Sequence, residues 1–243
     1  SPSHRSRLRS RARRPSSAPG RLMLGRVLVL ETSTETGSVA ITRDGVLVGD
    51  LSFASRDATG ARTEALAPAV VQCLDRAAMP MSEVSAVVCG AGPGGFTSLR
   101  SAAAFAKGIC SALSIPLYAV PSLELLVWTA VTSDGYLIAA LQAGRGEWFC
   151  QDANRDGDRT ELVGATYLAG DDELRARAAR MHAQLIGPGL DVDARPLAHA
   201  VVPWLSDIEA RGAVDLDSWE PTYGRLAEAQ VKWEAAHGRP LTT

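Results

Sequence analysis

Apolar and polar positions first form a regular pattern at Val27. The continuous apolar run 27–30 is typical of a strand covered on both faces. Two further apolar runs, 38–42 and 46–51, are separated by Asp44-Gly45, which is a strong hairpin signal. The pattern therefore predicts three successive antiparallel strands.

The next segment alternates between helical and strand patterns. Apolar residues at helical spacing predict a helix over 63–78, with Leu66, Val70 and Leu74 on its apolar face. The same reasoning then predicts a strand over 82–89, an alanine-rich helix over 97–113 and a short strand over 115–120.

The second half of the chain repeats this order of strands and helices in part. Strands are expected over 136–141, 147–152, 161–164 and 185–187, and helices over 122–131, 171–183, 197–209 and 224–236. We therefore expect an α/β fold of two lobes with an internal duplication. The expected units are a first lobe over 23–120, a smaller second lobe over 121–220, and a C-terminal helix and tail over 221–243 that can pack back on the first lobe.

Charge is unevenly distributed along the chain. Seven of the 25 basic residues are arginines before Met23, where no acidic residue occurs, so the rest of the chain has 18 basic against 27 acidic residues. An acidic body is a poor direct ligand for nucleic acid, because phosphate contacts need clustered Lys and Arg. Residues 1–22 are expected to be a disordered basic tail, either a transit peptide or an over-extended N-terminus.

Composition also limits the compartment and the kind of metal site. No apolar run approaches the ~18 residues needed to span a bilayer, which argues against an integral membrane protein. The four cysteines are isolated and lie in apolar contexts, which is typical of small buried hydrophobes in a reducing compartment such as the cytoplasm. The four histidines are scattered, so no zinc site built by the protein is expected.

A glycine-rich turn precedes the alanine-rich helix. Residues 90–95 read Gly-Ala-Gly-Pro-Gly-Gly and join an apolar run to the helix over 97–113. A strand, a glycine turn and a helix start can bind an anion, because the unpaired N–H groups of the helix point outward. The spacing matches neither a P-loop nor a GxGxxG motif. A tight turn that brings the helix close to a sheet explains it equally.

One hypothesis is nucleotide-dependent catalysis in a cleft between the lobes. The turn Thr32-Ser33-Thr34 could hold phosphate, and Glu31 could hold a hydrated magnesium ion. The glycines Gly187 and Gly189 could face adenosine. The alternative is that the hydroxyl residues simply stabilise a β-turn. A peptidase is not favoured, because Ser33 and Ser98 have no histidine near them in sequence.

A third hypothesis is a scaffold. The alanine-rich helix has one apolar stripe suited to a core and a second stripe of mostly small residues. The second stripe consists of Ser101, Ala104, Phe105, Gly108 and Ala112. A helix that is apolar on two sides is usually buried between neighbours, so the second stripe faces either a partner protein or the C-terminal helix of this chain.

Several segments together resemble the bacterial TsaB (YeaZ) family. The resemblance is carried by the segments 29–41 (VLETSTETGSVAI), 62–68 (RTEALAP), 92–100 (GPGGFTSLR), 104–108 (AFAKG), 115–124 (IPLYAVPSLE), 144–147 (GRGE) and 221–229 (PTYGRLAEA). Their order and separation cover nearly everything after Met23.

The resemblance implies a two-lobed, actin-like (ASKHA, RNase H-like) fold with a reduced second lobe. Members of this family are non-catalytic partners of TsaD, joined by the ATPase TsaE, in forming threonylcarbamoyladenosine beside the tRNA anticodon. TsaD carries the ATP and the divalent metal, so this chain is expected to hold no cofactor and no metal, to meet tRNA only through the complex, and to form a homodimer when alone. An ATP-binding or ATP-hydrolysing enzyme is the alternative.

The resemblance also assigns site residues. The partner interface is expected to include Leu66, Val70, Leu74, Ser101, Ala104, Phe105, Gly108 and Ala112. The vestigial nucleotide cleft is expected to include Glu31, Thr32, Ser33, Thr34, Gly92, Gly94, Gly187 and Gly189.

This sequence departs from the family pattern at five positions. The family usually has Asp at the position of Glu31, His at Arg62, Ser at Gly95, Gly at Ser98 and Asp at Gln142. The loss of the acid at Gln142 and the longer acid at Glu31 both weaken a catalytic role.

Overall fold

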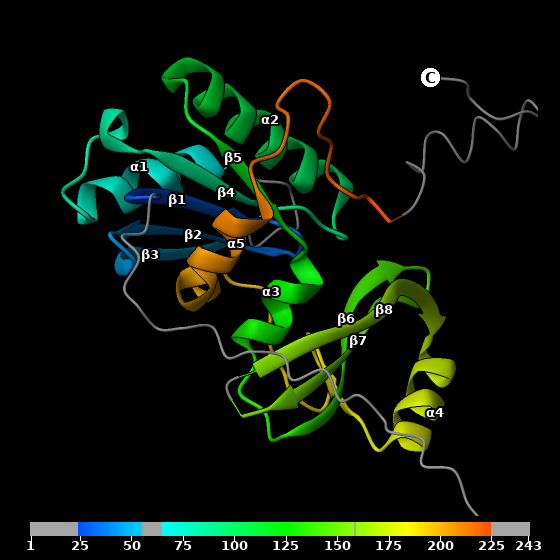
Figure 1. The fold of residues 1–243 in the computed structure, drawn as a ribbon. Coiled ribbons are helices and arrows are strands. Elements are labelled where there is room, and N and C mark those ends of the chain that lie inside the picture. The colour runs from blue at the N-terminus through cyan, green and yellow to red at the C-terminus, as the bar shows by residue number, and fades with distance from the viewer. Residues whose placement is uncertain (1–23, 55–64, 158, 225–243) are drawn as a thin grey trace, which may run out of the picture.

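The computed structural model describes residues 24–54, 65–157 and 159–224, and their arrangement is a two-lobed α/β fold (Figure 1). The expected basic tail, Arg62 and the expected helix over 224–236 lie wholly or almost wholly outside these residues.

The first lobe is built on a five-stranded mixed sheet. Its strands are β1 (Arg26–Glu31), β2 (Thr36–Arg43), β3 (Val46–Ala54), β4 (Ala86–Gly90) and β5 (Leu117–Val120). Their order in space is β3-β2-β1-β4-β5. Strands β1, β2 and β3 pair antiparallel as predicted, and β4 lies parallel to β1 and β5.

Two helices cover one face of this sheet. They are α1 (Leu66–Arg76) and α2 (Phe96–Leu113), and a short 3-10 helix, η1 (Met81–Glu83), follows α1. Side chains such as Leu28, Ile41 and Val87 alternate with residues of the opposite face along their strands and pack under the two helices.

The second lobe repeats the strand order of the first. Its strands are β6 (Gly135–Gly144), β7 (Glu147–Asp156), β8 (Arg159–Gly170) and β9 (Gln184–Ile186), in the spatial order β8-β7-β6-β9. Helix α4 (Asp171–Met181) precedes β9, as α1 precedes β4 in the first lobe. Strand β9 is parallel to β6, as β4 is to β1. This shared topology shows the internal duplication, with the second lobe reduced.

Helix α3 (Ser122–Thr129) lies between the two sheets (Figure 1). Leu125 packs on the second face of the first sheet, whereas Leu123 and Leu126 pack on the second sheet. Arg155 of β7 donates to the carbonyls of Val127 and Ala130 at 2.8 and 2.9 Å. These bonds satisfy carbonyl groups that a helix C-terminus leaves unpaired.

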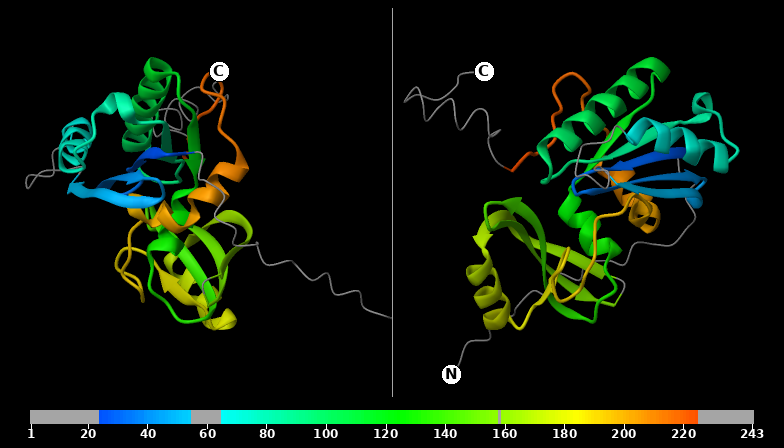
Figure 2. Two further views of the ribbon diagram at one scale, coloured as in Figure 1. Left: turned by 60° about the vertical axis from the view of Figure 1, so that its left-hand side comes forward. Right: turned by 180° about the vertical axis from the view of Figure 1, so that it is seen from behind.

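The chain returns to the first lobe earlier than expected. The predicted helix over 197–209 is a 3-10 helix, η2 (Ala198–Trp204), followed by α5 (Leu205–Arg211). Pro203 lies inside η2 and has no N–H to donate, which prevents a regular α-helix there. Both elements pack on the face of the first sheet opposite α1 and α2 (Figure 2). The unit predicted over 121–220 is therefore divided between the lobes.

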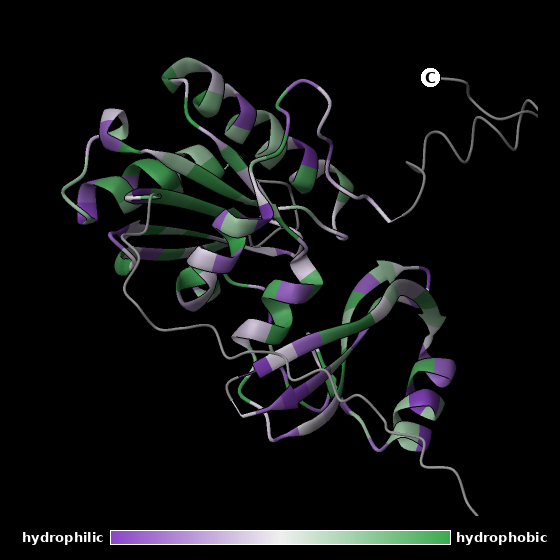
Figure 3. Ribbon diagram, in the orientation of Figure 1, coloured by the Kyte–Doolittle hydropathy of each residue, from purple (hydrophilic) through white to green (hydrophobic). Residues whose placement is uncertain are grey.

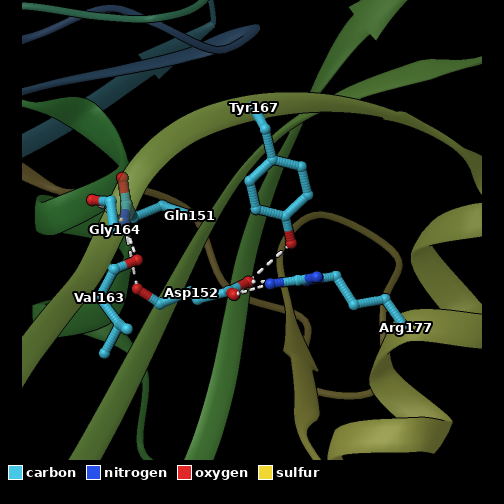
Figure 4. Close-up of polar contacts among 6 residues, drawn as sticks. All are labelled: Gln151, Asp152, Val163, Gly164, Tyr167 and Arg177. Atoms are coloured by element: carbon cyan, nitrogen blue, oxygen red, sulfur yellow. Dashed lines mark hydrogen bonds and ion pairs between the residues drawn. The ribbon is translucent and has the colours of Figure 1, made fainter.

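Strand β8 is much longer than the predicted strand 161–164, and a polar cluster holds it in place (Figure 4). Tyr167 of β8 donates to Asp152 of β7 at 2.6 Å, and Arg177 of α4 pairs with the same carboxylate. Where the pairing of β7 and β8 shifts register, the Gln151 amide donates to the Val163 carbonyl at 3.0 Å. The side chains thus replace ladder bonds that the irregularity removes.

Colouring by hydropathy shows the first sheet as mainly apolar, whereas the strands of the second sheet mix apolar and hydrophilic stretches (Figure 3). All four cysteines are buried and free. Within the described residues, no helix combines the length and apolar character needed to cross a bilayer.

Candidate functional site: the inter-lobe cleft and the exposed face of α2

The glycine turn 90–95 is packed against the turn that follows β1. The Gly95 N–H donates to the Ser33 carbonyl at 2.8 Å, and Gly94 lies so close to that carbonyl that any side chain at 94 would overlap it. Gly92 has a φ of 81° and lies against the carbonyl of Thr222. The predicted cleft residues Gly92 and Gly94 are therefore required for close backbone approach.

Glu31 is turned into the protein at the end of β1. It is fully buried, and its carboxylate accepts from the Ser33 N–H at 2.6 Å and from the Ser122 hydroxyl at 2.9 Å. Burial is the largest influence on this group and raises its pKa, although the hydrogen bonds oppose the shift. The Ser122 hydroxyl also accepts from the Gly92 N–H at 3.1 Å. Glu31 thus connects β1, the glycine turn and the start of α3.

A cleft of about 450 Å³ opens between the lobes. Ser33, Thr34, Glu35, Thr36, Gly95 and Ser98 line it from the first lobe, and Leu141, Gln142, Gly144, Pro188 and Arg195 line it from the second. The volume is in the range of small-molecule sites.

The other predicted cleft residues have structural roles. The Thr32 hydroxyl donates to the Ser98 carbonyl at 3.1 Å. Gly187 packs against the Ala140 carbonyl, and the Gly189 N–H donates to Asp193 at 3.0 Å. Ser33 and Thr34 are thus the members of the predicted set that line the cleft.

Arg195 is a cleft residue that sequence reasoning missed. It lies in the irregular segment after β9, where no hydrophobic periodicity indicates its position. Its guanidinium lies 3.7 Å from the Asp193 carboxylate. Only the folded chain brings this cation opposite Ser33.

Helix α2 has two distinct faces. Leu99, Ala102, Ala103, Ala106 and Cys110 are buried against the first sheet, in agreement with the predicted core stripe. On the opposite side Ser101, Ala104, Gly108 and Ala112 are exposed. A side chain built at Gly108 would meet nothing within 4 Å, so the helix backbone is open to close approach there. The C-terminal segment of the described chain does not cover this stripe.

The predicted interface residues of α1 do not share this exposure. Val70 is 0% exposed and Leu74 is 5% exposed, because both pack on the first sheet. Leu66 is partly buried against the same core, and so is Phe105 of α2. Val70 and Leu74 therefore cannot contact a partner in this conformation, since an amphipathic helix must use its apolar face to cover the sheet. Among the large apolar residues of α1, Val71 is exposed, at 57%.

Comparisons with known proteins agree with this architecture. A family model described as TsaD, tRNA N6-adenosine threonylcarbamoyltransferase, matches residues 55–188, which is more than half of the chain. The protein called YeaZ from Pseudomonas aeruginosa has a solved structure that is 26% identical, with a TM-score of 0.69, over 82% of this chain and 99% of that chain.

Curated relatives carry the name tRNA threonylcarbamoyladenosine biosynthesis protein TsaB. The one from Escherichia coli is 28% identical over 146 residues, which are 57% of this chain and 62% of that protein. The one from Bacillus subtilis is 25% identical over 234 residues, which are 85% of this chain and 97% of that protein. The chain belongs to the TsaB (YeaZ) family.

The described part of this TsaB chain brings no cluster of metal-ligating side chains into the cleft. The described residues contain no group of three or more His, Cys, Asp and Glu that could hold a metal ion. Gln142, where the family usually has an acid, is exposed at the cleft and cannot supply a carboxylate. The described histidines also lie away from it: His182 ends α4, and His199 is 3.2 Å from Asp50 of β3.

Proposed function

We propose that this TsaB-family chain is a scaffold subunit in the formation of threonylcarbamoyladenosine on tRNA. It pairs with a TsaD paralogue, which carries the ATP and the metal, and the ATPase TsaE joins the pair. The names of the curated relatives support the pathway. The observation that carries the scaffold role is the exposed stripe of small residues on α2.

The stripe is suited to close packing with another helix. Most of its side chains are Ser, Ala or Gly, so a second helix can approach the α2 backbone closely. The opposite face already covers the first sheet, which holds α2 in place. The acid that could have held a magnesium ion, Glu31, is buried and bonded within the protein.

Co-purification with TsaD tests the stripe directly. Replacing Ala104 and Gly108 by Leu should abolish the complex, because the new side chains occupy the space that the partner helix needs. Ala176→Leu on the exposed face of α4 is the matched control and should leave the complex intact. An intact complex in the Ala104/Gly108 double variant would refute the proposed interface.

The cleft supports a second proposal, an ATP-binding or ATP-hydrolysing enzyme. Ser33 and Thr34 face Gln142 and Pro188 across a cavity large enough for a nucleotide. This function predicts ATP hydrolysis by the purified chain alone, lost on Ser33→Ala. Hydrolysis at the buffer rate in a folded sample would exclude it.

A further inference from the structure

The last described segment, residues 212–224, crosses the first lobe as an irregular strap. Its Val214 N–H donates to the Leu117 carbonyl at 2.8 Å, and its Thr222 N–H donates to the Ala91 carbonyl at 2.7 Å. Val214, Leu216 and Trp219 pack against the core under α1 and α2. The strap therefore joins the outer edge of the first sheet to the turn that precedes α2.

A continuous row of contacts fastens the strap to one flank of α2. The ring of Tyr223 lies 4.5 Å from that of Phe96, and its hydroxyl donates to Glu220 at 3.1 Å. Glu220 in turn pairs with Lys107 at 3.3 Å, and Lys107 lies 5.9 Å from the Trp219 ring. The row thus spans about three turns of α2, from Phe96 to Lys107.

The end of the strap reaches the second lobe. Gly224 lies so close to the ring of Phe149 in β7 that any side chain at 224 would overlap it. In two views of the structure this end of the strap lies between the start of α2 and the second sheet (Figures 1 and 2). The strap therefore also connects α2 to the second lobe.

Besides the bonds of Gly95 to Ser33 and of Thr32 to the Ser98 carbonyl, helix α2 is weakly anchored at its start. Gly95 precedes it, no side chain caps its first N–H groups, and its first turn has no acidic residue. In its first half the fully buried residues apart from Leu99 are alanines, which bury little apolar area, whereas the larger side chains Phe105, Ile109 and Leu113 pack on the core further along the helix. A helix start with few large buried side chains and no cap opens locally at a low free-energy cost.

We propose that the strap positions α2 for partner binding, with Trp219 and Tyr223 as positioning residues that act through the helix. Their contacts lie on the flank formed by Phe96 and Lys107, beside the exposed stripe of Ala104 and Gly108. The strap holds the first turns of α2 in the geometry that the partner meets, and it links that geometry to the second lobe. This inference rests on the proposed pairing with TsaD.

Hydrogen exchange of the full chain tests the positioning role without the partner. In the Trp219→Ala/Tyr223→Ala variant, the amides of 96–107 should exchange about tenfold faster or more, because local opening of α2 becomes easier. Amides of β6 and β7 should keep the wild-type rate. Tyr136→Ala, which removes a half-exposed tyrosine from β6, is the matched control and should leave α2 unchanged.

Affinity for TsaD, measured by titration calorimetry, completes the test. The double variant should bind at least about tenfold more weakly, a change of about 1.4 kcal/mol. The single variant Tyr223→Phe keeps the ring contact with Phe96. Its amide exchange rates in α2 and its affinity for TsaD should therefore be closer to wild type than those of the double variant. If the double variant does not fold, Glu220→Gln should give the same changes with smaller amplitude, because it weakens the contact with Lys107.

Two results would overturn the strap's role. Unchanged α2 exchange in the folded variants would show that the strap does not hold the helix. Weaker binding with unchanged exchange would show that strap residues contact the partner directly. Failure of the wild-type chain to bind TsaD would instead refute the proposed function, and the exchange experiment would still decide whether the strap holds α2.

Discussion

Glu31 illustrates at the scale of one residue how burial changes the role of an acid. A carboxylate after the first strand is a reasonable magnesium ligand in the sequence. In the folded chain its two oxygens are occupied by the Ser33 N–H and the Ser122 hydroxyl, and no part of the residue lines the cleft.

The raised pKa of Glu31 predicts a pH effect on stability. A buried acid with a raised pKa binds its proton more tightly in the folded state, so the free energy of unfolding falls as pH rises above the ordinary value of 4.5 toward the folded pKa. Glu31→Gln resembles the protonated form in carrying no charge: its amide oxygen can still accept from the Ser33 N–H, and its amide N–H then donates to the Ser122 oxygen, which reverses that bond. The variant should therefore gain stability relative to wild type as pH rises from 4 to 8.

Thermal unfolding at a series of pH values checks this expectation. The difference in Tm between Glu31→Gln and wild type should grow with pH until Glu31 is fully ionised. A constant difference across the range would show that Glu31 titrates at the same pH in both states.

At the scale of elements, the sheet that each helix covers determines which face of the helix is buried. Helix α1 covers the antiparallel strands with Val70 and Leu74, which removes them from any interface. Helix α2 covers the sheet with one stripe and leaves the small residues of the second exposed, although the sequence left burial of that stripe under the C-terminal helix open. Helix α4 is held to its sheet by the cluster of Asp152, Tyr167 and Arg177 (Figure 4).

The two ion pairs of α4 are predicted to contribute unequally to stability. Asp152 is 6% exposed and accepts from both Tyr167 and Arg177, so Asp152→Asn should lower the free energy of unfolding by about 2 kcal/mol. Asp171 forms an exposed pair with Arg175 one turn away, so Asp171→Asn should have a much smaller effect. Urea unfolding of both variants measures the contrast, and equal losses would contradict the structural role of the cluster.

At the scale of the whole molecule, α3 connects the lobes through polar contacts at both ends. Arg155 binds its C-terminal carbonyls from the second lobe, and Ser122 at its start binds Glu31 of the first lobe. In between, Glu124 accepts two bonds of 2.7 Å from Arg211 of α5, and Arg211 lies 5.7 Å from the ring of Trp128. These contacts set the position of one lobe relative to the other.

The pair of Glu124 and Arg211 predicts non-additive mutational effects. Glu124 is 8% exposed, so Arg211→Ala leaves a buried carboxylate without its partner and should cost about 2 kcal/mol of stability, allowing for the half-exposed guanidinium. The double variant Glu124→Gln/Arg211→Ala removes that charge and should recover part of the loss. Urea unfolding of the single and double variants measures the difference, and a double variant less stable than Arg211→Ala would contradict this account.

The sequence by itself determined the elements and most of their order. Continuous apolar runs identified strands such as β1 and β4, because strands covered on both faces carry few polar residues, and the Asp44-Gly45 turn identified the first hairpin. The repeat of the strand order indicated two lobes. Both stripes of α2 were also visible from helical periodicity, but the sequence left open whether the second stripe faces a partner or the C-terminal helix of this chain.

Only the tertiary structure decided which surfaces remain free. The irregular segments carry no periodicity, so neither the strap over 212–224 nor Arg195 at the cleft could be placed from sequence. The direction of Glu31 depends on Ser122, 91 residues away, and the burial of Val70 and Leu74 depends on strands that precede α1 in the chain. Long-range contacts of this kind have no local signal, because they arise only when segments far apart in the sequence pack together.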